Sequence, residues 1–152
     1  MSNLEIVLFD TNQEALDGLK TACEDLSVIT VKNVERVLYT HPPSGIDAIV
    51  LVLPAAEKWG AKPILEAQVL NTSPDDQRSG MPRYVVAGGV LRREDTRDPV
   101  QDATMVIGTA LDAVRKFNAT NREGAIHRLG FWAVNLTGVT PEQLSAIFTR
   151  AL

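Results

Sequence analysis

Residues 46–53 read IDAIVLVL, and this stretch decides the fold class of the chain. Apart from Asp47, every side chain in it is apolar. A strand with only one face in the core alternates apolar and polar residues, whereas a parallel strand that is covered on both faces is apolar throughout. The stretch therefore predicts a central strand of a parallel sheet, with other parts of the chain packed against both of its sides.

Further strands and helices are predicted on either side of this strand. Runs of β-branched and aliphatic residues predict four more strands, at 4–9, 28–31, 83–88 and 127–134. Apolar residues at three- and four-residue spacing predict helices at 13–25 and 100–118. Because strands alternate with helices, we expect one α/β domain over residues 1–152, a three-layer α/β/α sandwich around a mostly parallel, mixed sheet.

Three other segments complete the predicted secondary structure. Thr140-Pro141-Glu142-Gln143 combines an N-cap residue, a proline at the first helical position and a glutamine at the capping-box position, so a last helix begins there. The segment 62–70 is predicted to be helical. The segment 71–82 is polar and contains two prolines and a glycine, which is typical of a loop.

The length, composition and net charge of the sequence exclude several classes of protein. The chain has 152 residues, of which 45% are hydrophobic and 22% charged, as in a globular domain. Its net charge of −4 leaves no basic surplus, so nucleic-acid binding is not expected. No apolar run could span a membrane and no signal peptide is recognisable, so we expect a cytoplasmic protein. One cysteine and two histidines leave little for a metal site, and no cofactor is predicted.

In open α/β sheets, ligands bind outside the carboxyl ends of the strands, and the loop 135–140 is the best anion-binding candidate there. Gly138 would let the backbone approach a ligand closely, and Thr137 and Thr140 offer hydroxyl groups. A loop with an ordinary helix cap explains the same residues. Gly88-Gly89 could likewise accommodate a ligand against the backbone or mark the end of a strand.

Other reactive or aromatic residues have structural explanations. We expect Cys23, on the apolar face of the first helix, to be a core residue, and His127 to be structural. Trp59 and Trp132 could stack on a base or pack in the core. The connector LRREDTRDP, residues 91–99, could be a solvated loop or could direct an arginine towards a pyrophosphate.

Five stretches occur in the order found in a known family. They are IVLFDTNQEAL, IDAIVLVLPAA, MPRYVVAGGVLRRED, VQDATMVIGTALDAVRKFN and RLGFWAVNLTGVTPEQ. Over most of its length the chain thereby resembles the macro domains, which bind ADP-ribose. The resemblance implies a nucleotide or anion site lined by Asn33, Ala55, Gly88, Thr137, Gly138 and Val139.

Some residues depart from the pattern of that family. Where macro domains have an aspartate that binds the adenine amino group, this chain has Asn33, which still offers a carbonyl acceptor but no charge. Residues 54–60 correspond to the first ligand loop of macro domains. They lack the family's asparagine and its run of glycines, and they include Glu57, which would repel a diphosphate.

The resemblance and these departures leave three possible functions. The first is a macro-like binding or structural module with a degenerate or altered site for ADP-ribose or a related nucleotide. The second is a hydrolase acting on an ADP-ribose derivative, either an ADP-ribosylated protein or ADP-ribose 1″-phosphate. The third is an interaction domain that forms homo-oligomers or binds a protein partner through Trp59, Phe131 and Trp132. The residues favour a binding module over an enzyme, with no catalytic residue assigned.

Overall fold

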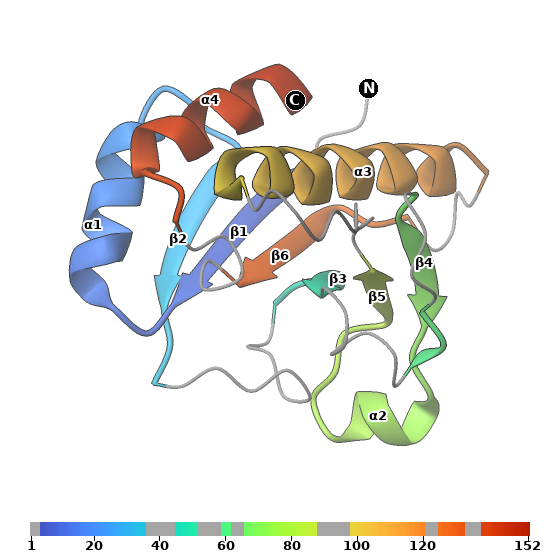
Figure 1. The fold of residues 1–152 in the computed structure, drawn as a ribbon. Helices are drawn as coiled ribbons and strands as arrows, with labels where there is room; N and C mark the ends of the chain where they lie inside the picture. The colour runs from blue at the N-terminus through green and yellow to red at the C-terminus, as the bar shows by residue number, and fades with distance from the viewer. Residues whose placement is uncertain are drawn as a thin grey trace.

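The computed structural model describes residues 4–35, 45–51, 59–61, 66–87, 98–120, 125–132 and 138–152. Six strands and four helices lie within these ranges (Figure 1). In chain order they are β1 (Glu5–Asp10), α1 (Gln13–Ala22), β2 (Ile29–Asn33), β3 (Ala48–Leu51), β4 (Gln68–Asn71), α2 (Pro74–Arg78), β5 (Tyr84–Ala87), α3 (Pro99–Thr120), β6 (Arg128–Trp132) and α4 (Pro141–Ala151). No helix in the described ranges is both long enough and apolar enough to cross a bilayer.

The strands form one mixed, mostly parallel sheet. Their order is β2-β1-β6-β3-β5-β4, and every neighbouring pair is parallel except β4 with β5. The predicted α/β class and all five predicted parallel strands are therefore confirmed. The strand register places Asp10 beside Asn33, and Leu51 beside Ala87. Because parallel strands end at the same edge of a sheet, we call this edge the carboxyl rim; it is formed by the last residues of β1, β2, β3, β5 and β6.

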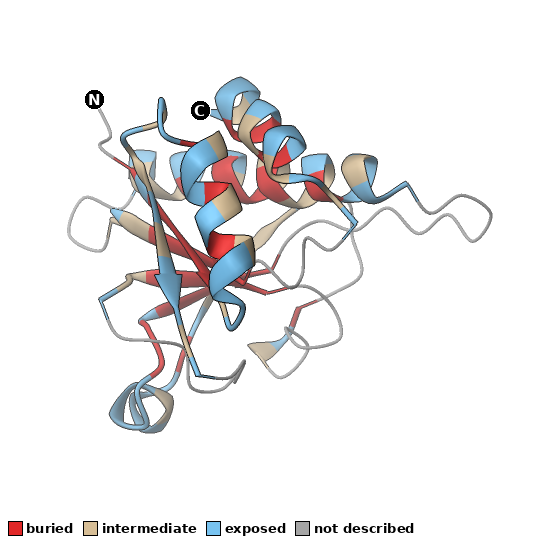
Figure 2. Ribbon diagram, turned by 90° about the vertical axis from the view of Figure 1, so that its left-hand side faces the viewer, coloured by how far each residue is buried: buried red, intermediate tan, exposed pale blue. Residues whose placement is uncertain are grey.

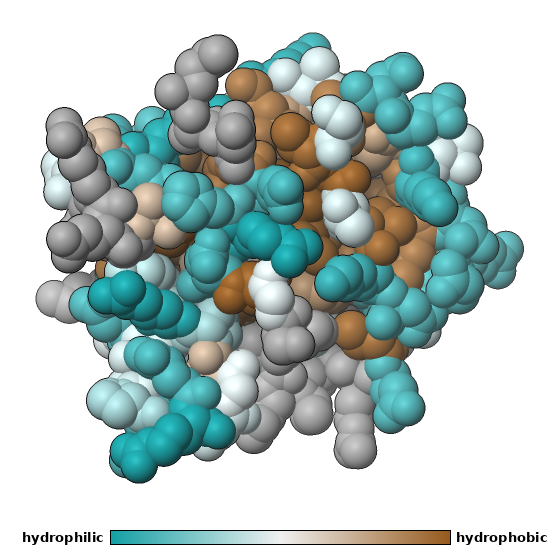
Figure 3. Space-filling view, turned by 180° about the vertical axis from the view of Figure 1, so that it is seen from behind, coloured by the Kyte–Doolittle hydropathy of each residue, from teal (hydrophilic) through white to brown (hydrophobic). Residues whose placement is uncertain are grey.

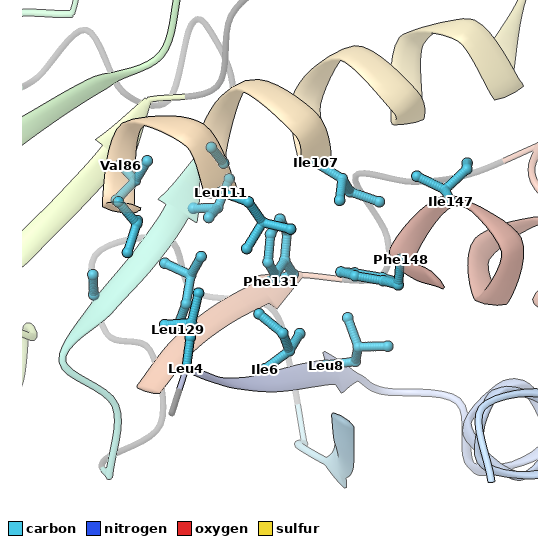
Figure 4. Close-up of a cluster of buried hydrophobic side chains, with 14 of the residues drawn as sticks. Leu4, Ile6, Leu8, Val86, Ile107, Leu111, Leu129, Phe131, Ile147 and Phe148 are labelled. Carbon is cyan, nitrogen blue, oxygen red and sulfur yellow. The ribbon is translucent and has the colours of Figure 1, made fainter. Parts of the chain in front are cut away.

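Helices α1, α3 and α4 cover one face of the sheet (Figures 1 and 2). The strands contribute alternate residues to this face, such as Ile6 and Leu8 of β1, as the two-residue period of a strand requires. Phe131 of β6 and Phe148 of α4 meet edge to face, with ring centroids 5.6 Å apart (Figure 4). Each such buried side chain contributes about 1.5–3 kcal/mol to stability, so this layer holds much of the hydrophobic core.

The opposite face of the sheet is also buried. Phe9 and Trp132 lie in van der Waals contact there, with ring centroids 5.6 Å apart, and Trp132 is only 1% exposed. Trp59 packs against this cluster and donates a hydrogen bond from Nε1 to Asp76 Oδ2 of α2, at 3.2 Å. The core explanation for Trp132 is confirmed, and the central strand is covered on both sides as its sequence predicts. An interface formed by Phe131 and Trp132 is excluded, because the two side chains are only 2% and 1% exposed. A second complete layer of helices remains a prediction.

Two predictions about 62–82 are wrong. Residues 68–71 form the antiparallel edge strand β4 and not a helix, while 62–65 lie outside the described residues. Most of β4 is half-buried, so its apolar pattern is weak, and its conformation comes from pairing with β5. The predicted loop contains α2, which Ser73 begins with a capping box: its side chain accepts from Asp76 N, and the Asp76 carboxylate accepts from Ser73 N. Ser, Pro and Asp are typical both of turns and of helix starts, and here they start a helix.

Candidate functional site

The structure describes three of the six predicted site residues, and all three lie at the carboxyl rim. Asn33 is the last residue of β2, and Gly138 and Val139 precede α4. Ala55, Gly88 and Thr137 lie outside the described residues, as do Gly89, Glu57 and the arginines of the connector after β5.

Asn33 belongs to a chain of hydrogen bonds that runs onto helix α1. Its Nδ2 donates to Gln13 Oε1 at 3.0 Å, and Gln13 Nε2 donates to Asp17 Oδ1 at 2.8 Å. All three side chains are exposed. Gln13 and Asp17 are four residues apart on one helix, which places them on the same face. Sequence reasoning missed both residues, although this spacing on a predicted helix was the signal that could have found them.

The chemistry of these three groups fixes the direction of the chain of bonds. A carboxylate only accepts, so the NH₂ group of Gln13 must face Asp17. The amide oxygen of Gln13 then faces Asn33, and only the NH₂ group of Asn33 can donate to it. Oδ1 of Asn33 is thus left as a hydrogen-bond acceptor, and it has no partner among the described residues.

Asp10 is the β1 neighbour of Asn33 and offers a second acceptor. Its Oδ1 accepts from the backbone N–H groups of Thr11, at 2.7 Å, and Asn12, at 3.2 Å. The backbone of the two strands is tied at the same level, because Val34 N donates to Asp10 O at 2.9 Å. This corner of the rim therefore presents carboxylate and amide oxygens, which suit a ligand that donates hydrogen bonds.

Gly138 and Val139 have structural roles. Gly138 has φ +82°, and a Cβ atom there would lie 2.9 Å from Cβ and Cγ of Pro99. The side of Gly138 on which another residue would carry its side chain therefore faces the first turn of α3. Val139 is half-buried and packs against the core cluster beneath the helices. The next residue, Thr140, is an N-cap that makes the predicted capping box with Gln143.

The helix N-termini at this rim are already supplied with acceptors. Asn12 caps α1, Asp98 accepts from the N–H groups of Val100 and Gln101 in α3, and Thr140 caps α4. The first turns of these helices also carry acidic residues, namely Glu14, Asp102 and Glu142. Free N–H groups and a positive helix end are what attract anions, so these three ends are poor phosphate sites. The ordinary-cap explanation accounts for Thr140.

The chain's cysteine and the described histidine lie far from this rim. His127 immediately precedes β6 and Cys23 follows α1, so both are at the opposite edge of the sheet. Cys23 is a core residue, as predicted, and burial raises the pKa of its thiol, while a hydrogen bond with Ser145 lowers it to a smaller extent. Among the residues that the structure describes, no group of three or more His, Cys, Asp and Glu side chains could hold a metal ion.

No protein-family model matches the chain, and no curated protein matches it.

Proposed function

We propose that this domain is a macro-like binding module that holds the nucleoside end of ADP-ribose or a related nucleotide at the carboxyl rim and does not turn it over. One observation carries the proposal: Asp17 and Gln13 orient the amide of Asn33 so that its Oδ1 is an acceptor. The resemblance to macro domains implies an adenine-binding acceptor at this position. An adenine amino group has the N–H donors that such an acceptor needs.

The charges around Asn33 favour the nucleoside over the phosphates. Asp10 and Asp17 flank it, and the ends of α1, α3 and α4 carry their own caps and acidic residues. A phosphate next to these carboxylates would be repelled. We therefore propose that hydrogen bonds to the base and ribose supply most of the affinity, and that phosphates add little.

The hydrolase alternative has less support. Acid–base and nucleophilic catalysis require a side chain within hydrogen-bond reach of the reacting atom. His127 and Cys23 are at the wrong edge of the sheet for a ligand beside Asn33. Of the two carboxylates near Asn33, Asp10 accepts from the N–H groups of Thr11 and Asn12, and Asp17 accepts from Gln13. Turnover assays with an ADP-ribosylated protein and with ADP-ribose 1″-phosphate test the alternative, and a rate above that of buffer would favour it over our proposal.

Calorimetry with adenosine, inosine and ADP-ribose tests the binding proposal. Inosine has a carbonyl in place of the amino group, so it would place an acceptor against Asn33 Oδ1. We expect adenosine to bind at least about tenfold more tightly than inosine, a difference of about 1.4 kcal/mol. ADP-ribose should bind about as well as adenosine. Equal affinity for the two nucleosides, or no heat from either at millimolar concentration, would contradict the proposal.

Variants of the amide chain make the test specific to this corner of the rim. Asn33→Ala removes the acceptor and should abolish the preference for adenosine, whereas Asn33→Asp keeps an acceptor and should retain it. Gln13→Ala should reduce the preference, because the Asn33 amide is then free to rotate. Thr30→Ala is the matched control, an exposed residue on the same strand away from the rim, and should leave the preference unchanged.

A further inference from the structure

Strand β2 is at one edge of the sheet, and no other described strand pairs with its outer side. Ile6 N donates to Val28 O, and Val34 N donates to Asp10 O. The backbone groups of the even-numbered residues between 28 and 34 therefore face β1. Backbone groups of a strand point alternately to its two sides. The backbone N–H and C=O groups of Ile29, Val31 and Asn33 therefore point to the side of β2 opposite β1. Of these three N–H groups, that of Ile29 donates a hydrogen bond within the subunit, to Leu26 O.

A groove lies alongside this free edge. It has a volume of about 390 Å³ and runs between the end of α1 and β2. Cys23, Leu26, Ile29 and Val31 line it with apolar atoms, and Lys20 is one of its charged residues. The view from behind shows hydrophobic side chains gathered in one area and surrounded by hydrophilic ones (Figure 3). A strand added to this edge would place alternate side chains over the groove.

Helix α1 presents a charged stripe beside the same edge. Gly18 faces α4, since a Cβ atom there would lie 3.4 Å from Pro141 Cγ. The opposite side of α1 carries Gln13, Asp17 and Lys20; Gln13 bonds to Asn33 of β2, and Lys20 lines the groove. Asp17 and Lys20 are thus two opposite charges, less than one helical turn apart, on the side of α1 that no described helix covers.

We propose that a second copy of this chain occupies the edge, with the two β2 strands antiparallel and Val31 on the twofold axis. Val31 N–H and C=O would exchange hydrogen bonds with Val31 of the partner subunit. Asn33 N–H would bond to the carbonyl of the partner's Ile29, whose own N–H is already used within its subunit. A twofold axis requires a self-complementary surface, and this register provides one. This inference does not rest on the proposed function.

The charges on α1 select this occupant. Helix α1 lies over the gap between β1 and β2. When the two β2 strands pair, the axes of the two α1 helices are therefore separated by two strand spacings of about 4.8 Å, or about 10 Å, which is a normal distance for packed helices. The helices are antiparallel across the axis. Gln13 is level with Asn33, and the second half of α1 lines the groove together with Ile29 and Val31, so we place Val31 level with the middle of the helix. Asp17 then faces the partner's Lys20, and Lys20 faces the partner's Asp17.

The register also avoids repulsion along the strands. Lys32 would lie opposite Thr30 of the partner subunit, whereas a register centred one residue later would set Lys32 against the partner's Lys32. Like charges directly opposite each other destabilise a strand pair. A lysine on a sheet edge often prevents pairing, but here it excludes only the alternative register.

Sedimentation velocity over a concentration series tests the proposal. We expect the wild-type chain to pass from monomer to dimer as its concentration rises. Val31→Pro removes an N–H that points away from β1, so the sheet tolerates the change while the dimer loses both hydrogen bonds of the central Val31 pair. We expect this variant to raise the dissociation constant at least about tenfold. A wild-type chain that stays monomeric to about 0.5 mM would overturn the proposal.

Charge reversal tests the orientation of the two copies. Lys20→Glu alone and Asp17→Lys alone should each weaken the dimer, because each brings like charges together. The double variant should recover most of the wild-type affinity, since opposite charges then face each other again. Lys116→Glu, on the exposed side of α3, is the matched control and should have no effect. A dimer that is indifferent to Val31→Pro and to both single reversals uses another surface, and that result would overturn the proposal.

Discussion

Gly138 lies directly against Pro99, so the loop before α4 touches the first residue of α3. A Cβ atom at 138 would be 2.9 Å from two carbons of the proline ring, and the φ angle of +82° is itself unfavourable for any other residue. The contact joins two helices that begin at the carboxyl rim. Gly138 is therefore needed for this close approach whether or not a ligand binds at the rim.

We predict that Gly138→Ala destabilises the fold by more than the backbone strain alone. Strain at such a φ angle costs about 1–3 kcal/mol, and contact with Pro99 adds to it. Gly80→Ala is the control, because Gly80 has φ +104° but nothing within 4 Å of a Cβ atom. Urea denaturation should show the larger loss for Gly138→Ala. Equal losses would mean that the Pro99 contact is easily relieved.

Asp47, the one charged residue of the stretch 46–53, should be needed for stability. Its Oδ2 accepts from the backbone N–H groups of His127 at 2.8 Å and Arg128 at 2.9 Å, which ties the start of β6 to β3. Asp47→Ala leaves both donors without this partner and should cost about 1–3 kcal/mol. Asp47→Asn retains one oxygen and should cost less. Thermal unfolding of the two variants measures the difference, and an alanine variant as stable as the asparagine variant would contradict it.

Gly130 of β6 should not tolerate a side chain without a loss of stability. A Cβ atom there would lie 2.9 Å from Phe9 Cε2 and from Ile46 Cδ1, and 3.1 Å from Ile49 Cδ1. Overpacking of this kind typically costs about 1–3 kcal/mol. Ile46→Val removes one of the clashing atoms, so Gly130→Ala should be less harmful in its presence. A double-mutant cycle measures this coupling, and strictly additive losses would show that Ile46 does not limit the space.

The raised pKa of Cys23 predicts a loss of stability at alkaline pH. Burial favours the neutral thiol in the folded chain, so the folded state keeps its proton at a pH where the unfolded chain has begun to lose it. The stability that this group contributes is complete below the pKa of the unfolded thiol and falls as the pH rises above it.

The comparison of wild type with Cys23→Ala isolates this effect, because other groups also titrate in the alkaline range. The free energy of unfolding of the wild type should decrease more steeply with pH than that of the variant. Parallel curves would show that the folded and unfolded thiols have the same pKa.

Sequence and tertiary structure each determined a different part of this protein. Apolar runs such as 46–53, helical spacing at 100–118 and the capping residues at 140–143 are local signals, because burial and backbone hydrogen bonding act on neighbouring residues. They were enough to predict five parallel strands, their helices and the carboxyl rim where Asn33, Gly138 and Val139 lie.

Only the tertiary structure decided what these residues contact. Strand β4 owes its conformation to β5, and no local pattern reveals a pairing partner. The direction of the Asn33 amide depends on Gln13, 20 residues earlier in the chain, and the use of Gly138 depends on Pro99. Such contacts join distant parts of the chain at distances of a few ångströms, where a hydrogen bond or a methyl group decides the outcome, and local spacing carries no information about them.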